Sequence, residues 1–116
     1  MALLLLFLFS GVASAQDYPV SKSPKYYNAG IMTDEHGEQY VMFVDMNSKK
    51  KIDKNNFHLT IAETYADGRI YYNRMYLTKE PPQWRCDRGK HSKWQAVIPG
   101  TTGAQVYQKI FGRKPR

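Results

Sequence analysis

Cysteine is almost absent from this chain of 116 residues, with Cys86 as its only example. Small secreted domains often stabilise a thin hydrophobic core with disulfides, and a single cysteine excludes any disulfide within the chain. We expect Cys86 to be a buried, inert thiol; a bond to another chain is the alternative. Stability must then come from packing, for which the sequence supplies nine Tyr, five Phe and two Trp.

Long hydrophobic runs are missing beyond the first nine residues. The apolar run over residues 2–9 is too short to span a bilayer, which takes about 20 residues. Ala13-Ser14-Ala15 follows it and has the small-x-small form that signal peptidase cleaves. The sequence therefore predicts a signal peptide over residues 1–15 and a secreted protein with no stable membrane insertion. Residues 16–25 contain two prolines and two serines and are expected to form a flexible leader.

Arginine is missing from the first half of the expected mature chain. Residues 16–68 carry six lysines against eight acidic residues, whereas residues 69–116 carry eleven lysines and arginines against Glu80 and Asp87. This strong positive charge in the C-terminal half favours an anionic partner, and we expect residues 69–116 to bind RNA or an acidic protein surface. A basic protein that its charge merely keeps soluble is the alternative. The sequence leaves the oligomeric state open.

Motifs of the common enzyme classes are also lacking. The chain has no glycine-rich phosphate loop, no His-Glu-x-x-His helix and no nucleophile elbow, and its three histidines are scattered. We therefore expect no cofactor, no metal ion and no catalysis. A ribonuclease would need a general base, a general acid and a cation for the phosphate. The candidates for such a site are His91, His58, Glu63 and Arg74.

Alternating apolar residues and closely spaced turn signals predict a mainly β fold, with about six antiparallel strands in a small sandwich or barrel. The single domain is expected over residues 26–111, with a basic tail at 112–116. Strands are predicted at 26–33, 38–46, 57–65, 69–78, 93–98 and 104–111, and loops at 47–56 and 79–92. Residues 38–46 are apolar on both faces, which is typical of a central strand.

Residues 57–65 support two interpretations. As a strand, their odd-numbered positions are apolar except for Glu63, and the Asp-Gly pair at 67–68 is a preferred two-residue hairpin turn. As a helix over about 55–66, an asparagine would cap the start and Gly68 the end. The helix would give an α+β, ribonuclease-like fold in which it packs on an antiparallel sheet. We favour the strand.

The most unusual local sequence is 84–94, where cations and a histidine lie between two tryptophans. Cations attract phosphates, and exposed indoles stack on unpaired bases. We predict that this segment grips RNA or an acidic partner; the alternative is that both indoles pack in the core beside an exposed loop. The predicted binding residues are Trp84, Arg85, Arg88, Lys90, His91, Lys93 and Trp94.

With its leader, small size, basic charge and aromatic β-rich sequence, the chain resembles the secreted virulence effectors of plant-pathogenic fungi. Two effector folds are similar in layout: the six-stranded β-sandwich of MAX effectors and the ribonuclease-like fold of powdery-mildew effectors. Residues 93–100 are similar to the catalytic strand of secreted guanyl-specific fungal ribonucleases, with Gln95 where an acid is needed. Residues 17–20 lie where the ribonuclease-like effectors have Tyr-x-Cys, but they contain no cysteine.

This resemblance implies a secreted, non-catalytic effector that binds a host protein or RNA through its basic C-terminal half. Passage into host cells is left open. The alternative that it implies is a secreted ribonuclease or a ribonuclease-like toxin.

Overall fold

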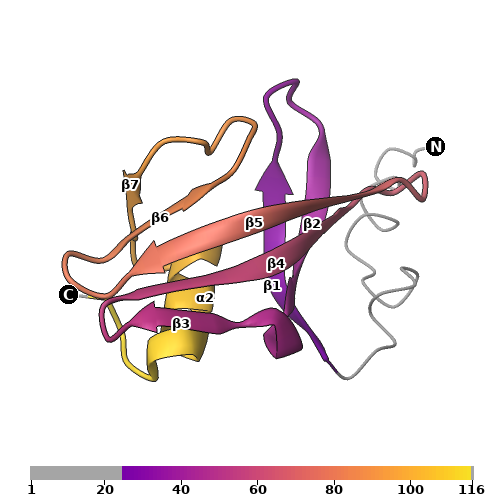
Figure 1. The fold of residues 1–116 in the computed structure, drawn as a ribbon. Coiled ribbons are helices and arrows are strands. Elements are labelled where there is room, and N and C mark those ends of the chain that lie inside the picture. The colour runs from indigo at the N-terminus through magenta and orange to yellow at the C-terminus, as the bar shows by residue number, and fades with distance from the viewer. Residues whose placement is uncertain (1–24, 116) are drawn as a thin grey trace.

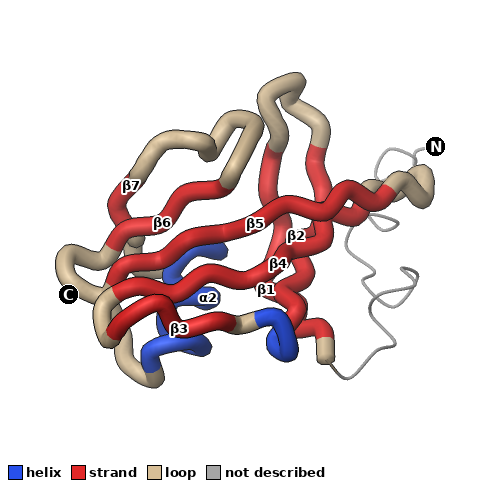
Figure 2. Tube along the Cα trace, in the orientation of Figure 1, coloured by secondary structure: helices blue, strands red, loops and turns tan. Residues whose placement is uncertain are grey.

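A computed structural model describes residues 25–115 as one curled antiparallel sheet with a helix against its inner side (Figure 1, Figure 2). The predicted signal peptide and residues 16–24 of the predicted leader lie outside the described residues. The strand order is β1-β2-β4-β5-β6-β7, and β3 pairs with the start of β4. The elements are β1 (Tyr26–Thr33), β2 (Gln39–Asp45), the 3₁₀ turn η3 (Met46–Ser48), β3 (Lys50–Asp53), β4 (Asn56–Thr64), β5 (Ile70–Thr78), β6 (Gln83–Cys86), β7 (Gln95–Ala96) and the helix α2 (Thr102–Phe111).

The predicted mainly β architecture is confirmed, and residues 57–65 lie in a strand. The helical interpretation of 55–66 is wrong, because β4 pairs along its whole length with β5. The turn between them contains the predicted Asp-Gly pair but is not the predicted two-residue turn, because Asp67 does not have a positive φ. Gly68 N–H donates to the Tyr65 carbonyl at 3.0 Å, and Tyr65 N–H donates to the Arg69 carbonyl at 2.9 Å. Gly68 has a φ of 96°, a conformation that glycine adopts without steric cost.

The predicted strand at 104–111 is wrong, because these residues belong to α2. Thr101 caps the helix by accepting a hydrogen bond from Ala104 N–H at 3.3 Å. Gly112 ends it with a φ of 71° and donates its N–H to the Gln108 carbonyl at 2.8 Å. The buried residues recur at helical spacing, which the alternation of a short apolar run does not distinguish from a strand.

Three other segments differ from the prediction. The loop expected at 79–92 contains β6, which starts directly after the Pro-Pro turn at 81–82 and pairs with the end of β5. The loop expected at 47–56 contains β3, and the strand expected at 93–98 is reduced to the two residues of β7. All three strands are short, so their own sequences carry little signal, and pairing with a longer neighbour creates them.

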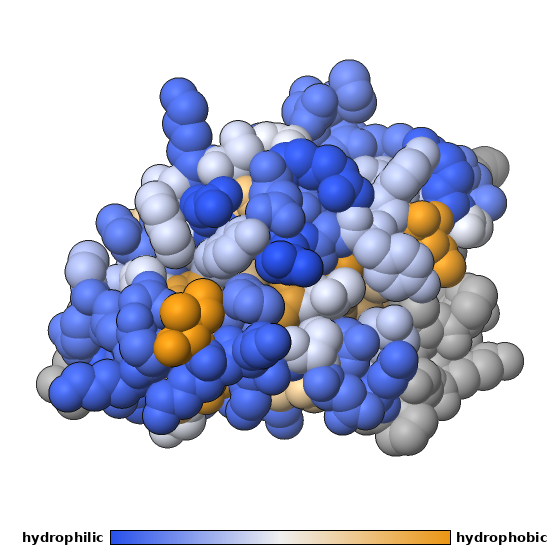
Figure 3. Space-filling model, viewed as in Figure 1, coloured by the Kyte–Doolittle hydropathy of each residue, from blue (hydrophilic) through white to orange (hydrophobic). Residues whose placement is uncertain are grey.

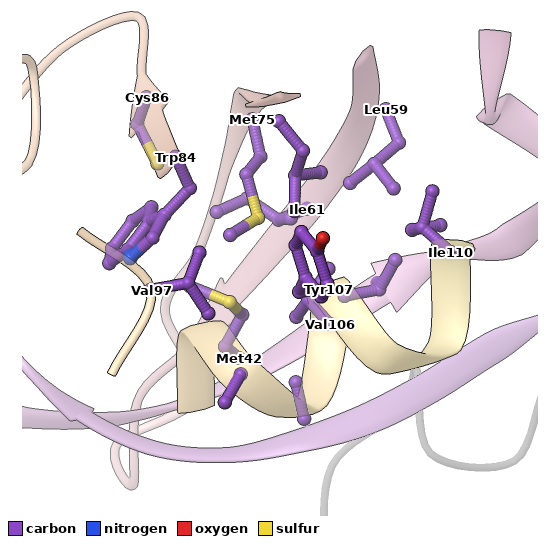
Figure 4. Packing of buried hydrophobic residues seen from close by; sticks show 14 of the residues in the cluster. Met42, Leu59, Ile61, Met75, Trp84, Cys86, Val97, Val106, Tyr107 and Ile110 are labelled. Atoms are coloured by element: carbon purple, nitrogen blue, oxygen red, sulfur yellow. The ribbon is translucent and has the colours of Figure 1, made fainter. Parts of the chain in front are cut away.

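The main hydrophobic core lies between the inner side of the sheet and α2, whose Val106, Tyr107 and Ile110 point toward the strands (Figure 4). As predicted, β2 is apolar on both faces and lies between two other strands. Its even-numbered residues join the main core, while Val41 and Phe43 form a second small cluster with Ala62 on the other side of the sheet. The sheet therefore has an inner side covered by α2 and an outer side without a helix.

Candidate functional site

The sheet places the predicted site residues on its two opposite sides, because successive strand residues point in opposite directions. On β6, Arg85 points outward, whereas Trp84 and Cys86 belong to the main core. Trp84 is only 5% exposed, so its indole is not available to a partner. Cys86 is a buried free thiol, as predicted, and burial raises its pKa to about 12. A thiol with so high a pKa is an unreactive one.

The outward side of β3, β4, β5 and β6 carries a row of cross-strand partners, and we call this side the outer face. The row runs Lys50–His58–Tyr76–Arg85. The His58 and Tyr76 rings are 5.9 Å apart between centroids. The guanidinium carbon of Arg85 lies 4.3 Å from the Tyr76 ring centroid and 5.6 Å from that of Trp94. Arg85 thus contacts two aromatic rings, and the Trp94 ring is 46% exposed.

Neighbouring rows extend this surface. Arg74 is exposed beside Thr60, and Tyr72 is 51% exposed next to it on β5. The outward positions of β4, β5 and β6 carry no carboxylate, and Asp87 follows only after the end of β6. Figure 3 views the molecule from this side, where α2 is hidden, and shows a mainly hydrophilic surface. On β3, Asp53 is the cross-strand partner of Asn56 and accepts hydrogen bonds from the Asn56 side chain at 3.0 Å. The outer face therefore combines exposed aromatic rings and several cations with a carboxylate at its β3 edge.

The inner side contains a cleft with a volume of about 580 Å³ at the end of the sheet away from residues 112–115. It lies between the β1–β2 turn at residues 34–38 and the loop at 88–91 after β6. Figure 1 shows these two loops beside each other at one end of the molecule. The turn contributes acidic side chains and the loop contributes basic ones. The polar groups that line the cleft include Asp34, Glu35, Tyr40, Glu63, Arg88 and Lys90.

Glu63 lies on the inner face of β4 and lines this cleft, as its place among the apolar positions of the strand predicted. Burial raises its pKa above the ordinary value, while a hydrogen bond from Asn73 Nδ2 at 3.3 Å and the charge of Arg88 act in the opposite direction. Within residues 25–115 no ion pair forms to Glu63. The cleft therefore holds a half-buried carboxylate that forms no ion pair with any residue of the described part.

His91 lies on the same side of the sheet, with its ring centroid 4.8 Å from that of the buried Trp84. Burial lowers its pKa, the charge of Lys90 lowers it further, and a contact from Gln95 Nε2 to His91 Nδ1 at 3.1 Å raises it. No carboxylate contributes to this shift. Glu63 and His91 therefore line one cleft, and the charge of Glu63 is not among the causes that shift the pKa of His91.

The lowered pKa of His91 predicts that acid destabilises the fold. Between the lowered folded pKa and the unfolded value near 6.5, the unfolded chain binds more protons than the folded one, so the free energy of unfolding falls as the pH drops through 6.5. The free energy of unfolding, measured with urea, should fall less between pH 7.5 and pH 5.5 in His91→Gln than in the parent protein. His36→Gln, which removes an exposed histidine, is the control. Equal pH dependence in the parent and His91→Gln would contradict the assignment.

The four residues predicted for a ribonuclease are not brought together. Glu63 and His91 line the cleft, whereas His58 and Arg74 lie on the outer face. Of the predicted binding residues, Arg88, Lys90 and His91 line the cleft, and Arg85 and Trp94 belong to the outer face. Lys93 is exposed next to Trp94.

Sequence reasoning missed several residues of both surfaces. Lys50, Tyr76 and Tyr72 on the outer face, and Tyr40 and Asp34 in the cleft, were not among the predicted site residues. Their even spacing along strands is visible in the sequence, but which of them become neighbours depends on the register of pairing.

Among the described residues, no three His, Cys, Asp or Glu side chains are placed to share a metal ion. The helices of the described part are all too short or too polar to cross a membrane. No protein-family model, curated protein or solved structure matches the chain, so the proposals below depend on its own residues.

Proposed function

We propose that the outer face binds single-stranded RNA, and that the protein is a secreted, non-catalytic binding protein of the effector type. The observation that supports RNA binding most directly is the contact of Arg85 with both Tyr76 and the exposed Trp94, on a surface where β4, β5 and β6 place no carboxylate outward. Such a surface can neutralise phosphates and offer rings to bases at the same time.

The positive charges supply attraction that does not depend on base sequence. Lys50, Arg74 and Arg85 lie on β3, β5 and β6, with β4 between the first two, so a strand of RNA that crosses the outer face would bring several phosphates close to a cation. Each phosphate that is neutralised releases condensed counterions, and binding therefore weakens as salt is added. An acidic protein surface would gain the same charge contacts.

The aromatic rings favour RNA over an acidic protein. Tyr72 and Trp94 are each about half exposed, so their rings are accessible to a partner. Unpaired bases stack on such rings, at about 1–3 kcal/mol for each base. Duplex RNA keeps its bases stacked inside the helix and cannot use them. We therefore infer that the strand bound is single.

Removing the outer-face charges should weaken RNA binding about 10-fold or more and make it less dependent on salt. The test variant changes Lys50, Arg74 and Arg85 to glutamine together, and fluorescence anisotropy with a labelled single-stranded RNA measures the affinity at several salt concentrations. Three lost phosphate contacts should reduce the slope of log affinity against log salt by about 2. Trp94→Ala alone should weaken the affinity for RNA about tenfold, which corresponds to the loss of one stacked base.

The matched control changes Lys79, Lys109 and Lys114 to glutamine, which removes the same charge away from the outer face. Equal weakening by both triple variants would mean that net charge alone attracts RNA. Equal affinity for a poly-glutamate peptide, with no effect of Trp94→Ala, would indicate an acidic protein partner instead. Either result would contradict the proposal.

The ribonuclease alternative has one observation in its favour, since Glu63 and His91 line the same cleft. The RNA of the binding assay should remain intact on a denaturing gel if the protein only binds. Shortening of the RNA that Glu63→Gln or His91→Ala abolishes would establish the alternative.

A further inference from the structure

We propose that the cleft on the inner side binds the C-terminal arginine of a peptide, with the guanidinium at Glu63 and the carboxylate at Arg88 and Lys90. This site is separate from the outer face and does not depend on RNA binding there. The proposal is built from the floor of the cleft, its aromatic wall and the opposite charges of its two rims.

The floor holds a buried hydroxyl without a partner. Tyr40 is 3% exposed and lines the cleft, and no residue of the described part hydrogen-bonds to its hydroxyl. Met42 is the cross-strand partner of Glu63, and Tyr40 lies two residues along β2 on the same side of the sheet, so Tyr40 and Glu63 are diagonal neighbours that both line the cleft. A buried hydroxyl that makes no hydrogen bond is destabilising. A ligand that reaches the floor with an N–H donor would relieve this.

The carboxylate beside it also has unused acceptor positions. Glu63 accepts from Asn73 Nδ2, and its two oxygens offer about four lone-pair positions. A guanidinium donates two parallel hydrogen bonds to a carboxylate, and its remaining N–H groups can donate to a phenol oxygen. Glu63 and Tyr40 together therefore match a guanidinium better than they match a single ammonium.

The aromatic wall of the cleft suits a planar cation. The Tyr65 ring centroid lies 5.4 Å from that of Tyr40 and 5.7 Å from that of Tyr71. The chain already packs one guanidinium here: the Arg69 guanidinium carbon lies 4.5 Å from the Tyr65 ring centroid, and Arg69 Nη2 lies 2.5 Å from Glu38 Oε2. A guanidinium deeper in the cleft would make the same two kinds of contact with Tyr40 and Glu63.

The two rims select a ligand with both charges. Asp34 and Glu35 lie on one side, and Arg88 and Lys90 on the other. The rims approach each other at Gly89, where a Cβ would lie 3.6 Å from Glu35 Oε1. A simple cation would be repelled by the basic rim, and a polyanion by the acidic rim. A C-terminal arginine has a cation at one end and a carboxylate at the other, so it complements both.

Three small probes test the two halves of the proposal by calorimetry on the full chain. N-acetyl-L-arginine reproduces a C-terminal arginine, N-acetyl-L-citrulline replaces its guanidinium by a neutral urea, and N-acetyl-L-argininamide lacks the carboxylate. We expect N-acetyl-L-arginine to bind about tenfold more tightly than either of the others, because each loses a charge-assisted contact.

Variants of the chain assign each end of the probe. Glu63→Gln should remove the preference for the arginine probe over the citrulline probe, and the double change Arg88→Gln with Lys90→Gln should remove the preference for the acid over the amide. Asp87→Asn, an exposed carboxylate outside the cleft, is the control. Tyr40→Phe should weaken binding without unfolding the protein, because it removes only an unpaired hydroxyl.

Two results would overturn the proposal. The first is equal affinity for N-acetyl-L-arginine and N-acetyl-L-citrulline, or no binding of either, because both outcomes exclude recognition of the guanidinium. Equal binding of the acid and the amide would remove the basic rim from the site and point to an internal arginine. Neither result bears on RNA binding at the outer face, so the two proposals can be contradicted independently of each other.

Discussion

Replacing Gly103 with alanine should lower the free energy of unfolding by about 2 kcal/mol, because it overpacks the contact between α2 and β6. A Cβ on Gly103 would lie 2.6 Å from Trp84 Nε1 and 3.0 Å from its Cδ1. The indole is buried in the main core and cannot move aside without displacing its neighbours. The same substitution inside an ordinary helix raises stability by about 1 kcal/mol, so the expected sign is reversed.

Urea unfolding of the parent and of Gly103→Ala measures this difference. Gln108→Ala, an exposed position of the same helix, should change stability by less than about 0.5 kcal/mol. Trp84→Phe should reduce the cost of Gly103→Ala, because the smaller ring leaves room for the added methyl group. Stabilisation by Gly103→Ala would show that α2 does not lie against the indole.

The parts of the fold that the sequence predicted are those in which a local pattern and the long-range packing agree. In β2, apolar residues on both faces indicated a central strand, and each face is buried in its own cluster. In the β4–β5 hairpin, the Asp-Gly turn required the extended partners that the flanking residues supply. Glu63 was placed correctly for the same reason, since alternation assigned it to the inner side.

The helix α2 was predicted as a strand because its local signals are weak. Its start is marked only by Thr101, and a glycine at its second position lowers the helical propensity. Val106 and Ile110 are compatible with both periodicities, and the burial that decides between them comes from the sheet. Tertiary packing therefore determined the structure of this segment.

The sequence predicted several residues of the two candidate surfaces, but it did not predict which of them would lie next to each other. Segment 84–94 was correctly identified as exposed and basic in part, yet the curled sheet sends Arg85 and Trp94 to one side and Arg88 and His91 to the other. Lys50 joins Arg85 only through the pairing of four strands. Such neighbours follow from register, which a single sequence specifies only weakly.

Replacing Tyr107 with alanine should be the most damaging single change, with a loss of about 3–5 kcal/mol in the free energy of unfolding. Tyr107 is fully buried, and its ring centroid lies 4.8 Å from that of Phe111. Its hydroxyl donates to the Lys79 carbonyl at 2.8 Å and accepts from Arg113 Nε at 3.4 Å. One side chain thus fills the core and joins α2 to the β5–β6 turn.

Tyr107→Phe separates these two roles. It keeps the ring and loses only the hydroxyl, so we expect a cost of about 1 kcal/mol. Tyr72→Ala, which removes a ring that is 51% exposed, is the matched control and should cost far less than Tyr107→Ala. Urea unfolding of the three variants checks the order. If Tyr107→Ala is as mild as Tyr72→Ala, α2 does not complete the core, and the inner wall that supports both candidate surfaces must be held in another way.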